Sequence, residues 1–147
     1  MTEIRPSRLS DADQILEIWR RAVDATHHFL TPEDRRAIDE EVQILLPQLL
    51  LWVAVDEDDQ PTGFMSMSEL SLDALFIDPL KHGVGIGRAL VEFALRSNSY
   101  LMTDVNEDNG QAVAFYKRLG FKEIGRSSID SQGRSYPLVH MRLDPSA

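Results

Sequence analysis

The stretch that decides the fold reads Lys81-His82-Gly83-Val84-Gly85-Ile86-Gly87-Arg88, with a glycine at every second position. It follows a run typical of a strand, residues 70–77, and precedes a largely apolar run, residues 85–97, typical of a buried helix. Glycine lets the backbone approach a bulky ligand closely, or turn where a side chain would clash. Successive N–H groups at a helix N-terminus attract anions. The stretch therefore predicts a strand-loop-helix junction that fits a diphosphate.

Two better-known glycine motifs do not match this stretch. A P-loop needs a lysine followed by serine or threonine, and the dinucleotide fingerprint has a different glycine spacing. Taken alone, the stretch leaves open a tight turn that binds no ligand.

The first half of the chain predicts two helices. Ser10, followed by Asp13 three residues later, resembles a capping box at the start of the first helix. Thr31-Pro32 fits the cap and first position of the second helix, and Pro47 marks its end.

Short apolar runs bounded by polar turns predict the strands, which are residues 3–5, 51–55, 62–67, 70–77, 100–105, 121–126 and 136–143. A further helix is expected over residues 111–119, with Gly120 as its left-handed C-terminal residue, and a turn over residues 131–133. This order predicts an α/β (α+β) fold, in which a mixed, mostly antiparallel sheet is flanked by about four helices.

Composition narrows the class of protein. With 147 residues, of which 43% are hydrophobic, we expect one domain spanning residues 1–147. The sequence has no cysteine, which excludes disulfides, thiolate metal sites and a cysteine nucleophile. No run resembles a signal peptide or reaches membrane-spanning length, so we expect a cytoplasmic protein without a membrane partner.

The charge balance disfavours one class of partner. Twenty-four acidic and fifteen basic residues give a formal net charge of -9. Such a surface repels phosphate backbones on average, so no nucleic acid partner is expected. A local group of N–H donors can still bind an anion, because short-range contacts outweigh a screened field.

A second motif follows, Asn109-Gly110-Gln111-Ala112-Val113-Ala114-Phe115-Tyr116-Lys117-Arg118-Leu119-Gly120-Phe121. The two segments together resemble the GCN5-related N-acetyltransferase (GNAT) family. The cofactor loop of that family reads Arg/Gln-x-x-Gly-x-Gly/Ala, and its later pattern, Asn-x-x-Ala-x-x-x-Tyr-x-x-x-Gly-Phe, is present without a gap. The segment Thr26-His27-His28-Phe29-Leu30 is similar to one in small bacterial acetyltransferases of unassigned substrate.

The resemblance implies a GNAT-like fold and an enzyme that transfers an acetyl group from acetyl-coenzyme A to a primary amine of a small molecule or peptide. It also implies a set of cofactor-binding residues. The backbone of the preceding strand would hold the pantetheine arm, the loop N–H groups would bind the pyrophosphate, and two asparagines would contact the pantetheine. These residues are Leu75, Phe76, Ile77, His82, Gly83, Val84, Gly85, Ile86, Gly87, Arg88, Asn106 and Asn109, with Tyr116 beside them.

One position departs from the family pattern. The arginine or glutamine that begins the family loop is His82 here, a shorter side chain that is only partly charged near neutral pH. This substitution predicts weaker or pH-dependent cofactor binding, with Lys81 and Arg88 supplying the missing charge.

Three side chains are candidate catalytic groups. The resemblance makes Tyr116 the proton donor to the departing thiolate, and a phenol of ordinary pKa about 10 is protonated at pH 7. His27, between the first two helices, and Asp73, on the strand before the loop, are candidates for the base, and His27 could instead bind the acceptor. The adjacent histidines His27 and His28 have no further ligands at metal spacing, so no metal is expected.

Other interpretations of these residues remain open at this stage. Tyr116 could simply pack on the sheet, Asn109 could cap the following helix, and His27 could cap helix carbonyls. The same fold could serve as a non-catalytic acyl-coenzyme A sensor, in which His82 would be an early sign of divergence from the catalytic members of the family. Acetylation of charged transfer RNA is a third possibility, which the net charge opposes.

The sequence leaves the acceptor, the general base and the oligomeric state undecided. A cationic acceptor fits the acidic field, and the protein is expected to be a monomer or a homodimer. Free sheet edges for pairing with a second subunit are expected over residues 52–67 and in the final hairpin.

Overall fold

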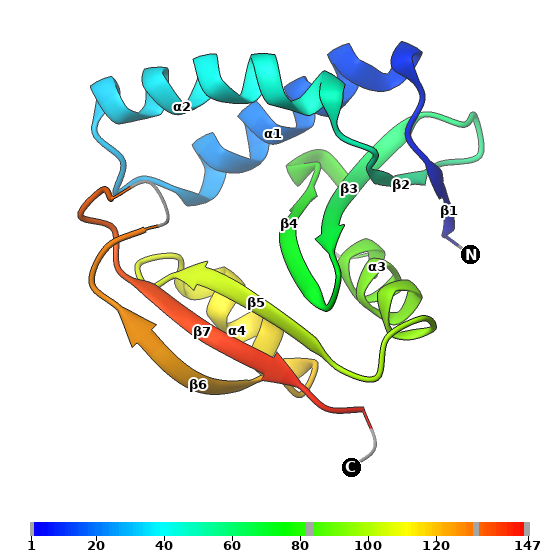
Figure 1. Cartoon of the computed structure of the whole chain (residues 1–147). Helices are drawn as coiled ribbons and strands as arrows, with labels where there is room; N and C mark the ends of the chain where they lie inside the picture. The colour runs from blue at the N-terminus through cyan, green and yellow to red at the C-terminus, as the bar shows by residue number, and fades with distance from the viewer. Residues whose placement is uncertain (1, 82–83, 131–132, 146–147) are drawn as a thin grey trace. The chain divides into compact units, whose positions relative to one another are not determined.

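The computed structural model of the protein describes residues 2–81, 84–130 and 133–145 (Figure 1). Its strands are β1 (Glu3–Pro6), β2 (Trp52–Val55), β3 (Pro61–Ser68), β4 (Ser71–Ile77), β5 (Leu101–Asn106), β6 (Lys122–Ser127) and β7 (Leu138–Leu143). The α-helices of the described ranges are α1 (Ala12–Thr26), α2 (Pro32–Leu45), α3 (Ile86–Leu95) and α4 (Gly110–Arg118). Every strand and helix predicted from the sequence is present, with ends shifted by a few residues at most. The predicted turn over residues 131–133 lies partly outside the described residues.

Hydrogen bonding orders the strands β1-β2-β3-β4-β5-β7-β6. β4 and β5 are parallel, whereas β1-β2, β2-β3, β5-β7 and β6-β7 are antiparallel. The predicted mixed, mostly antiparallel sheet is therefore confirmed. β1 and β6 are the edge strands, so the expectation of a free edge over residues 52–67 was wrong: β2 and β3 are paired on both sides.

The chain divides into two compact units. The first unit consists of Met1–Ser66 and Ala74–Phe93, and the second of Met67–Asp73 and Ala94–Ala147. β4 contributes its first three residues to the second unit and the rest to the first. A single domain over residues 1–147 stays a prediction, and each unit is described separately.

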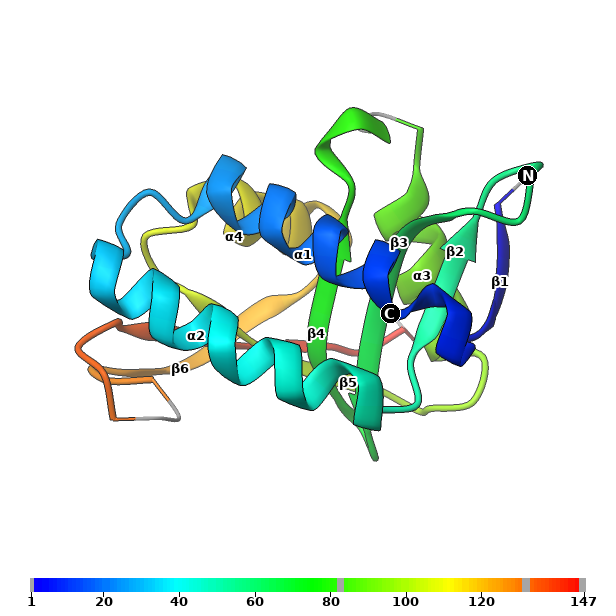
Figure 2. The ribbon, with the colours of Figure 1, turned by 90° about the horizontal axis from the view of Figure 1, so that it is seen from above.

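The core of the first unit lies between α1 and the strands β2 and β3. The buried side chains of this core are Ile15, Ile18, Trp19, Val23, Leu51, Val53, Val55 and Phe64. The four α1 members recur at helical spacing and give the helix one apolar stripe. α2 lies beside α1 (Figure 2) and has no fully buried residue, with Ile38 and Val42 half-buried against the core. Thr31 caps α2 as predicted, with its Oγ1 accepting the Asp34 N–H at 3.1 Å.

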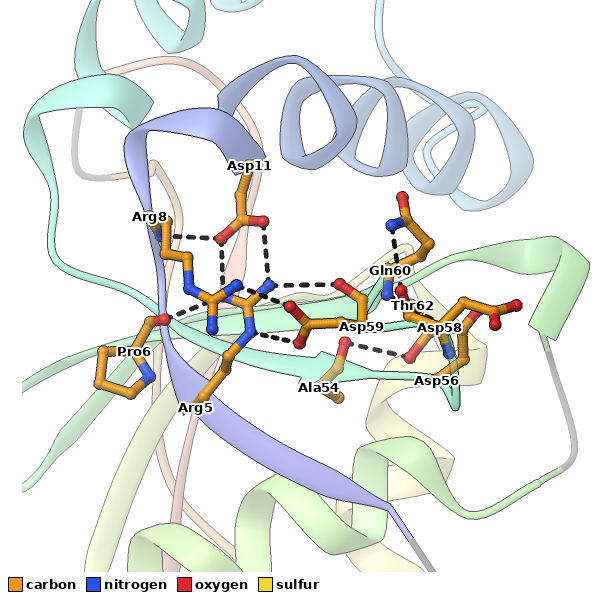
Figure 3. A network of polar contacts seen from close by, with 10 residues as sticks. All are labelled: Arg5, Pro6, Arg8, Asp11, Ala54, Asp56, Asp58, Asp59, Gln60 and Thr62. Carbon is orange, nitrogen blue, oxygen red and sulfur yellow. Dashed lines mark hydrogen bonds and ion pairs between the residues drawn. The ribbon is translucent and has the colours of Figure 1, made fainter.

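The chain enters α1 differently from the prediction. Ser10 lies within a 3-10 turn, Leu9–Asp11, and the capping contact runs from the Arg8 N–H to the Asp11 carboxylate at 2.7 Å. The guanidinium of Arg5 holds that carboxylate through two further hydrogen bonds, of 2.8 and 3.1 Å (Figure 3). The expected Ser10/Asp13 capping box was therefore wrong, because a charge-assisted bidentate contact outweighs a hydroxyl cap.

Arg5 also joins this turn to the β2-β3 hairpin. Its Nε donates to the Asp59 carboxylate at 2.9 Å, and Arg8 reaches the same carboxylate at 2.6 Å (Figure 3). The side chains of Arg5 and Asp11 are only 11% and 6% exposed. The hydrogen bonds from Arg5 outweigh burial and lower the pKa of Asp11.

Replacing Arg5 by methionine is expected to lower the free energy of unfolding by about 3 kcal/mol, because Asp11 would remain buried without its cation. The matched Arg8→Met change removes a charge that is 57% exposed and should cost less than about 1 kcal/mol. Because the pKa of Asp11 is lowered in the folded state, its stabilisation is present above about pH 4 and is lost as pH falls through the folded pKa. Urea titrations of both variants at pH 7 and in acid test this. Equal losses for the two arginines would contradict it.

The second unit is built around the alternation of side chains along β5 and β7. Leu101, Thr103 and Val105 are buried on one face of β5, and Val139 and Met141 are buried on the same face of β7. α4 covers this face and lies behind β5 and β7 in Figure 1. The opposite face of β5 carries Met102 and Asp104, both exposed. Gly120 ends α4 with φ of +106°, the left-handed conformation that the sequence predicted.

Candidate functional site

The glycine-rich stretch begins α3 in the first unit. Gly85 has φ of +79° and its carbonyl accepts the Ala89 N–H at 3.0 Å, so it caps the helix. The first N–H groups of a helix lack intrahelical partners and carry its positive dipole end. Val84 is 68% exposed, which leaves this end of the helix open to a ligand. His82 and Gly83, which the sequence assigned to pyrophosphate binding, lie outside the described residues.

The approach to the loop is fixed by Asp78, which directly follows β4 and is 6% exposed. Its N–H donates to the Thr62 carbonyl at 2.9 Å, and its carboxylate accepts from Arg21 at 2.9 Å and from the Leu80 N–H at 3.0 Å. Burial alone would raise the pKa of Asp78, but the bonds from Arg21 and Leu80 prevail and lower it. No role was assigned to Asp78 from the sequence, although an acidic residue directly after a strand was the available signal.

An Asp78→Asn variant should unfold at lower denaturant, with a loss of about 2 kcal/mol, because the amide cannot pair with Arg21. We also expect the dissociation constant of acetyl-coenzyme A to rise several-fold, since the residues that lead into α3 lose their anchor. Calorimetry and urea titration measure the two effects, with the exposed Asp13→Asn on α1 as control. Reduced stability with unchanged cofactor affinity would show that Asp78 does not organise the loop.

The end of β4 packs closely on β3. A Cβ on Gly63 would meet Ile77 Cδ1 at 2.9 Å and the Phe76 carbonyl at 3.1 Å, so a larger residue would push these strands apart. Phe76 also contacts Phe64, with ring centroids 5.6 Å apart. Leu75, Phe76 and Ile77, predicted to hold the pantetheine arm, thus form a half-buried strand end.

Tyr116 is buried in the second unit and hydrogen-bonds Thr103 on β5. Thr103 Oγ1 donates its only proton to the Leu72 carbonyl on β4 at 2.9 Å, so the Tyr116 O–H donates to Thr103. Burial raises the pKa of Tyr116 above its ordinary value. The phenol is therefore protonated at neutral pH and can donate a proton.

The sequence did not identify the partner of Tyr116. Thr103 stands in phase with the buried residues Leu101 and Val105, and a polar residue at such a position was the available signal. It lies where β4 pairs with β5, in the register Ser71↔Met102 and Leu72↔Thr103.

The two predicted cofactor asparagines lie at the junction between β5 and α4. Asn109 caps α4, its side-chain oxygen accepting the Ala112 N–H at 3.2 Å, and is 8% exposed. The capping interpretation is therefore correct, and contact with the cofactor stays a prediction. Asn106 ends β5, pairs in register with Leu138, and is half-buried.

His27 follows α1 in the first unit and is half-buried beside Phe29, with ring centroids 5.2 Å apart. Thr26 Oγ1 donates to the Ala22 carbonyl and lies 2.8 Å from His27 Nδ1. Since that hydroxyl has one proton, Nδ1–H of His27 donates to it, and Nε2 keeps its lone pair. Burial, with a smaller contribution from His28, lowers the pKa of His27 to about 4, so the ring is neutral at pH 7.

Asp73 lies on the part of β4 that belongs to the second unit. Its side chain is exposed, and its two oxygens accept hydrogen bonds from the hydroxyls of Ser68 and Ser71. Both oxygens of the Asp73 carboxylate are therefore already engaged by serine hydroxyls.

A cavity of about 410 Å³ opens in the first unit beside α1 and the β2-β3 turn. Its lining includes Asp13, Glu17, Arg21, Asp56 and Asp78, and Lys81 is the one lining residue to which the sequence gave a role in cofactor binding. Within the described ranges, no group of histidine and acidic side chains could hold a metal ion. No helix there is long and apolar enough to cross a membrane.

The Acetyltransferase (GNAT) domain family matches residues 19–145. Peptidyl-lysine N-acetyltransferase YjaB of Escherichia coli is 51% identical to this chain over 138 residues, which cover 94% of each chain. Peptidyl-lysine N-acetyltransferase YiaC of the same organism is 30% identical over 122 residues, which cover 80% of this chain and 82% of YiaC. The solution structure of apo-form YjaB from Escherichia coli superposes with a TM-score of 0.92 at 50% identity, over 97% of each chain.

The chain belongs to the GNAT family. It is an acetyl-coenzyme A-dependent N-acetyltransferase, as the resemblance predicted, and the alternative of a non-catalytic sensor is not favoured. The fold also matches a phosphinothricin acetyltransferase from Sinorhizobium meliloti in complex with acetyl-coenzyme A, with a TM-score of 0.65 at 20% identity.

Proposed function

We propose that this protein acetylates the side-chain amine of lysine in peptides or proteins. The observation that carries the proposal is the identity of about half of all positions with YjaB, a protein named for peptidyl-lysine acetylation. The formal charge of -9 supports it, because an acidic protein attracts a lysine-bearing acceptor.

The proposed cofactor contacts follow the family motif. In the first unit, the N–H groups at the start of α3 would bind the diphosphate, and the backbone of Leu75 to Ile77 would bind the pantetheine arm. In the second unit, Asn106 and Asn109 would contact the pantetheine. Lys81 and Arg88 are both exposed at the ends of the glycine stretch. They would supply the positive charge that His82, which is only partly protonated near neutral pH, provides only in part.

The reaction joins the lysine nitrogen to the acetyl carbonyl carbon as the bond from that carbon to sulfur breaks. Tyr116 would give its proton to the departing sulfur, which requires its O–H to turn from Thr103. Thr103 can then turn its own O–H toward the phenolate. His27, neutral with a free lone pair on Nε2, would bind the acceptor through that nitrogen. Asp73 is not assigned the base, because two serine hydroxyls occupy its oxygens.

The test is acetyl transfer to a lysine peptide. The protein is incubated with acetyl-coenzyme A and a panel of matched peptides that contain lysine, Nε-acetyllysine or a free α-amine only, and thiol release and peptide mass are followed together. Thiol release with a matching mass increase on the lysine peptide alone is expected. Activity confined to polyamines or other small amines would refute lysine as the acceptor while leaving the enzyme class intact.

We further propose a cytoplasmic location, where acetyl-coenzyme A and lysine-bearing proteins occur together. The oligomeric state is assigned only as monomer or homodimer, and sedimentation of the purified protein distinguishes the two.

A further inference from the structure

Three polar side chains form a hydrogen-bonded row on the second unit that the assigned site does not use. His140 Nδ1 on β7 lies 2.5 Å from the Asp104 carboxylate on β5, and His140 Nε2 lies 2.6 Å from Ser127 Oγ on β6. The cross-strand register sets this contact, because Asp104 and Gly125 are both opposite His140. The side chains of Asp104 and His140 are 59% and 29% exposed, so the row is open to a substrate.

The direction of each hydrogen bond follows from the donors available. A carboxylate only accepts, so Nδ1 of a neutral His140 carries the ring proton and donates it to Asp104. Nε2 then has a lone pair and accepts the Ser127 hydroxyl proton. This arrangement polarises the hydroxyl toward the ring and prepares the pair to take up a proton through Ser127 Oγ.

The hydrogen-bonded row and Thr103, the partner of the proposed acid Tyr116, lie on opposite faces of β5. Thr103, which bonds Tyr116, is buried under α4, whereas Asp104, the next residue, points to the opposite face. Acetyl transfer needs a group that accepts a proton from the attacking amine and a group that gives one to the departing sulfur. The hydrogen-bonded row therefore begins at Asp104, one residue along β5 from the partner of the proposed acid.

The same face carries few other charged groups. The charged residues opposite or near His140 on this face are Asp104 on β5, Lys122 on β6 and Arg142 on β7. Arg142 is bound to Asp144 and lies 3.8 Å from the ring centroid of Tyr100, so its charge is already neutralised locally.

The bases suggested by the sequence are less suited to this step. Burial lowers the pKa of His27 to about 4, which leaves a weak base, and both oxygens of the Asp73 carboxylate already accept hydrogen bonds from serine hydroxyls. His140 instead has a carboxylate partner to stabilise the positive charge that it gains.

We propose that Ser127 and His140 take the proton from the acceptor amine, and that Asp104 positions the histidine. The inference rests on the proposed lysine acetylation. As the lysine nitrogen attacks, its proton passes to Ser127 Oγ while the Ser127 proton passes to His140 Nε2. The resulting imidazolium is held by Asp104 and returns its proton to solvent after the product leaves.

The kinetic experiment compares His140→Gln, Asp104→Asn and Ser127→Ala with the wild type on a lysine peptide. We expect kcat/KM near pH 7 to fall about 100-fold for His140→Gln, with the dissociation constant of acetyl-coenzyme A unchanged. The acidic limb of the wild-type pH profile should disappear in this variant, and the deficit should shrink toward pH 10, where the lysine amine, of pKa about 10.4, loses its proton unaided. His28→Gln and Ser128→Ala, both at exposed positions, are the matched controls.

Several outcomes would overturn the proposal. One is a pH profile of kcat/KM for His140→Gln that has the same shape as that of the wild type. Another is an acetyl group on Ser127, found by mass spectrometry after incubation without acceptor, which would make Ser127 a covalent carrier instead of a proton relay. ¹⁵N NMR of the histidine rings tests the geometry without any turnover, and a His140 ring protonated on Nε2 instead of Nδ1 at neutral pH also refutes the relay. If the wild type acetylates no lysine peptide, the proposed function fails, and the NMR result still decides the geometry.

Discussion

Replacing Tyr116 by phenylalanine is expected to lower kcat for lysine-peptide acetylation about 100-fold, because the departing thiolate loses its proton donor. The ring fills the same buried space on α4, so the core should keep its packing. The KM for acetyl-coenzyme A should stay within about twofold, since the hydroxyl acts in the transition state and adds little to ground-state binding. Steady-state kinetics over both substrates measure the two parameters.

Two further variants separate the chemistry from the packing. Tyr100→Phe makes the same atomic change in a tyrosine that lies beside Arg142, and should keep wild-type kcat. Thr103→Val removes the hydroxyl that holds the Tyr116 O–H and should lower kcat about 10-fold, whereas Thr103→Ser should restore most of it. A Tyr116→Phe enzyme with wild-type kcat would mean that water or another group protonates the thiolate.

The parts of the molecule that the sequence predicted well are those governed by local rules. Thr31-Pro32 starts α2 because a hydroxyl cap and a proline suit the first turn of a helix, whatever the helix packs against. Gly120 and Gly85 adopt positive φ because glycine does so at low cost. The class of enzyme was identified from two family motifs, which are residues 81–88 and 109–121.

The sequence failed where residues distant along the chain decide the outcome. Ser10 and Asp13 form a plausible capping box, yet Arg5, which also binds Asp59 on a separate hairpin, holds Asp11 in the capping contact instead. No local pattern pairs Arg5 with Asp59, because the contact depends on strand register.

The candidate bases show the same limitation. His27 was selected for its place between two helices, and its half-buried setting beside Phe29, which weakens it as a base, depends on packing. His140 and Asp104 are separated by a whole helix and a strand, and their contact follows only from the antiparallel register of β5 and β7.

A Gly85→Glu, Gly87→Glu double variant is expected to weaken acetyl-coenzyme A binding by about 100-fold or more. Two carboxylates at the start of α3 would repel the diphosphate, and a factor of 100 corresponds to only about 2.7 kcal/mol of repulsion and lost N–H contacts. Calorimetric titration of acetyl-coenzyme A and of free coenzyme A measures the loss, which should be equal for the two ligands because they share the diphosphate.

The charge must be separated from the strain, because Gly85 has φ of +79° and any side chain there is disfavoured. The Gly85→Gln, Gly87→Gln variant carries the same strain and nearly the same bulk without the charge, so the difference between the two variants reports repulsion alone. Gly110→Glu, at the start of α4 with open space around it, tests the effect of one added carboxylate away from α3 and should bind like the wild type. If the Gln and Glu variants lose affinity equally, the loop is sensitive to shape only. If both bind like the wild type, the diphosphate does not sit at the start of α3.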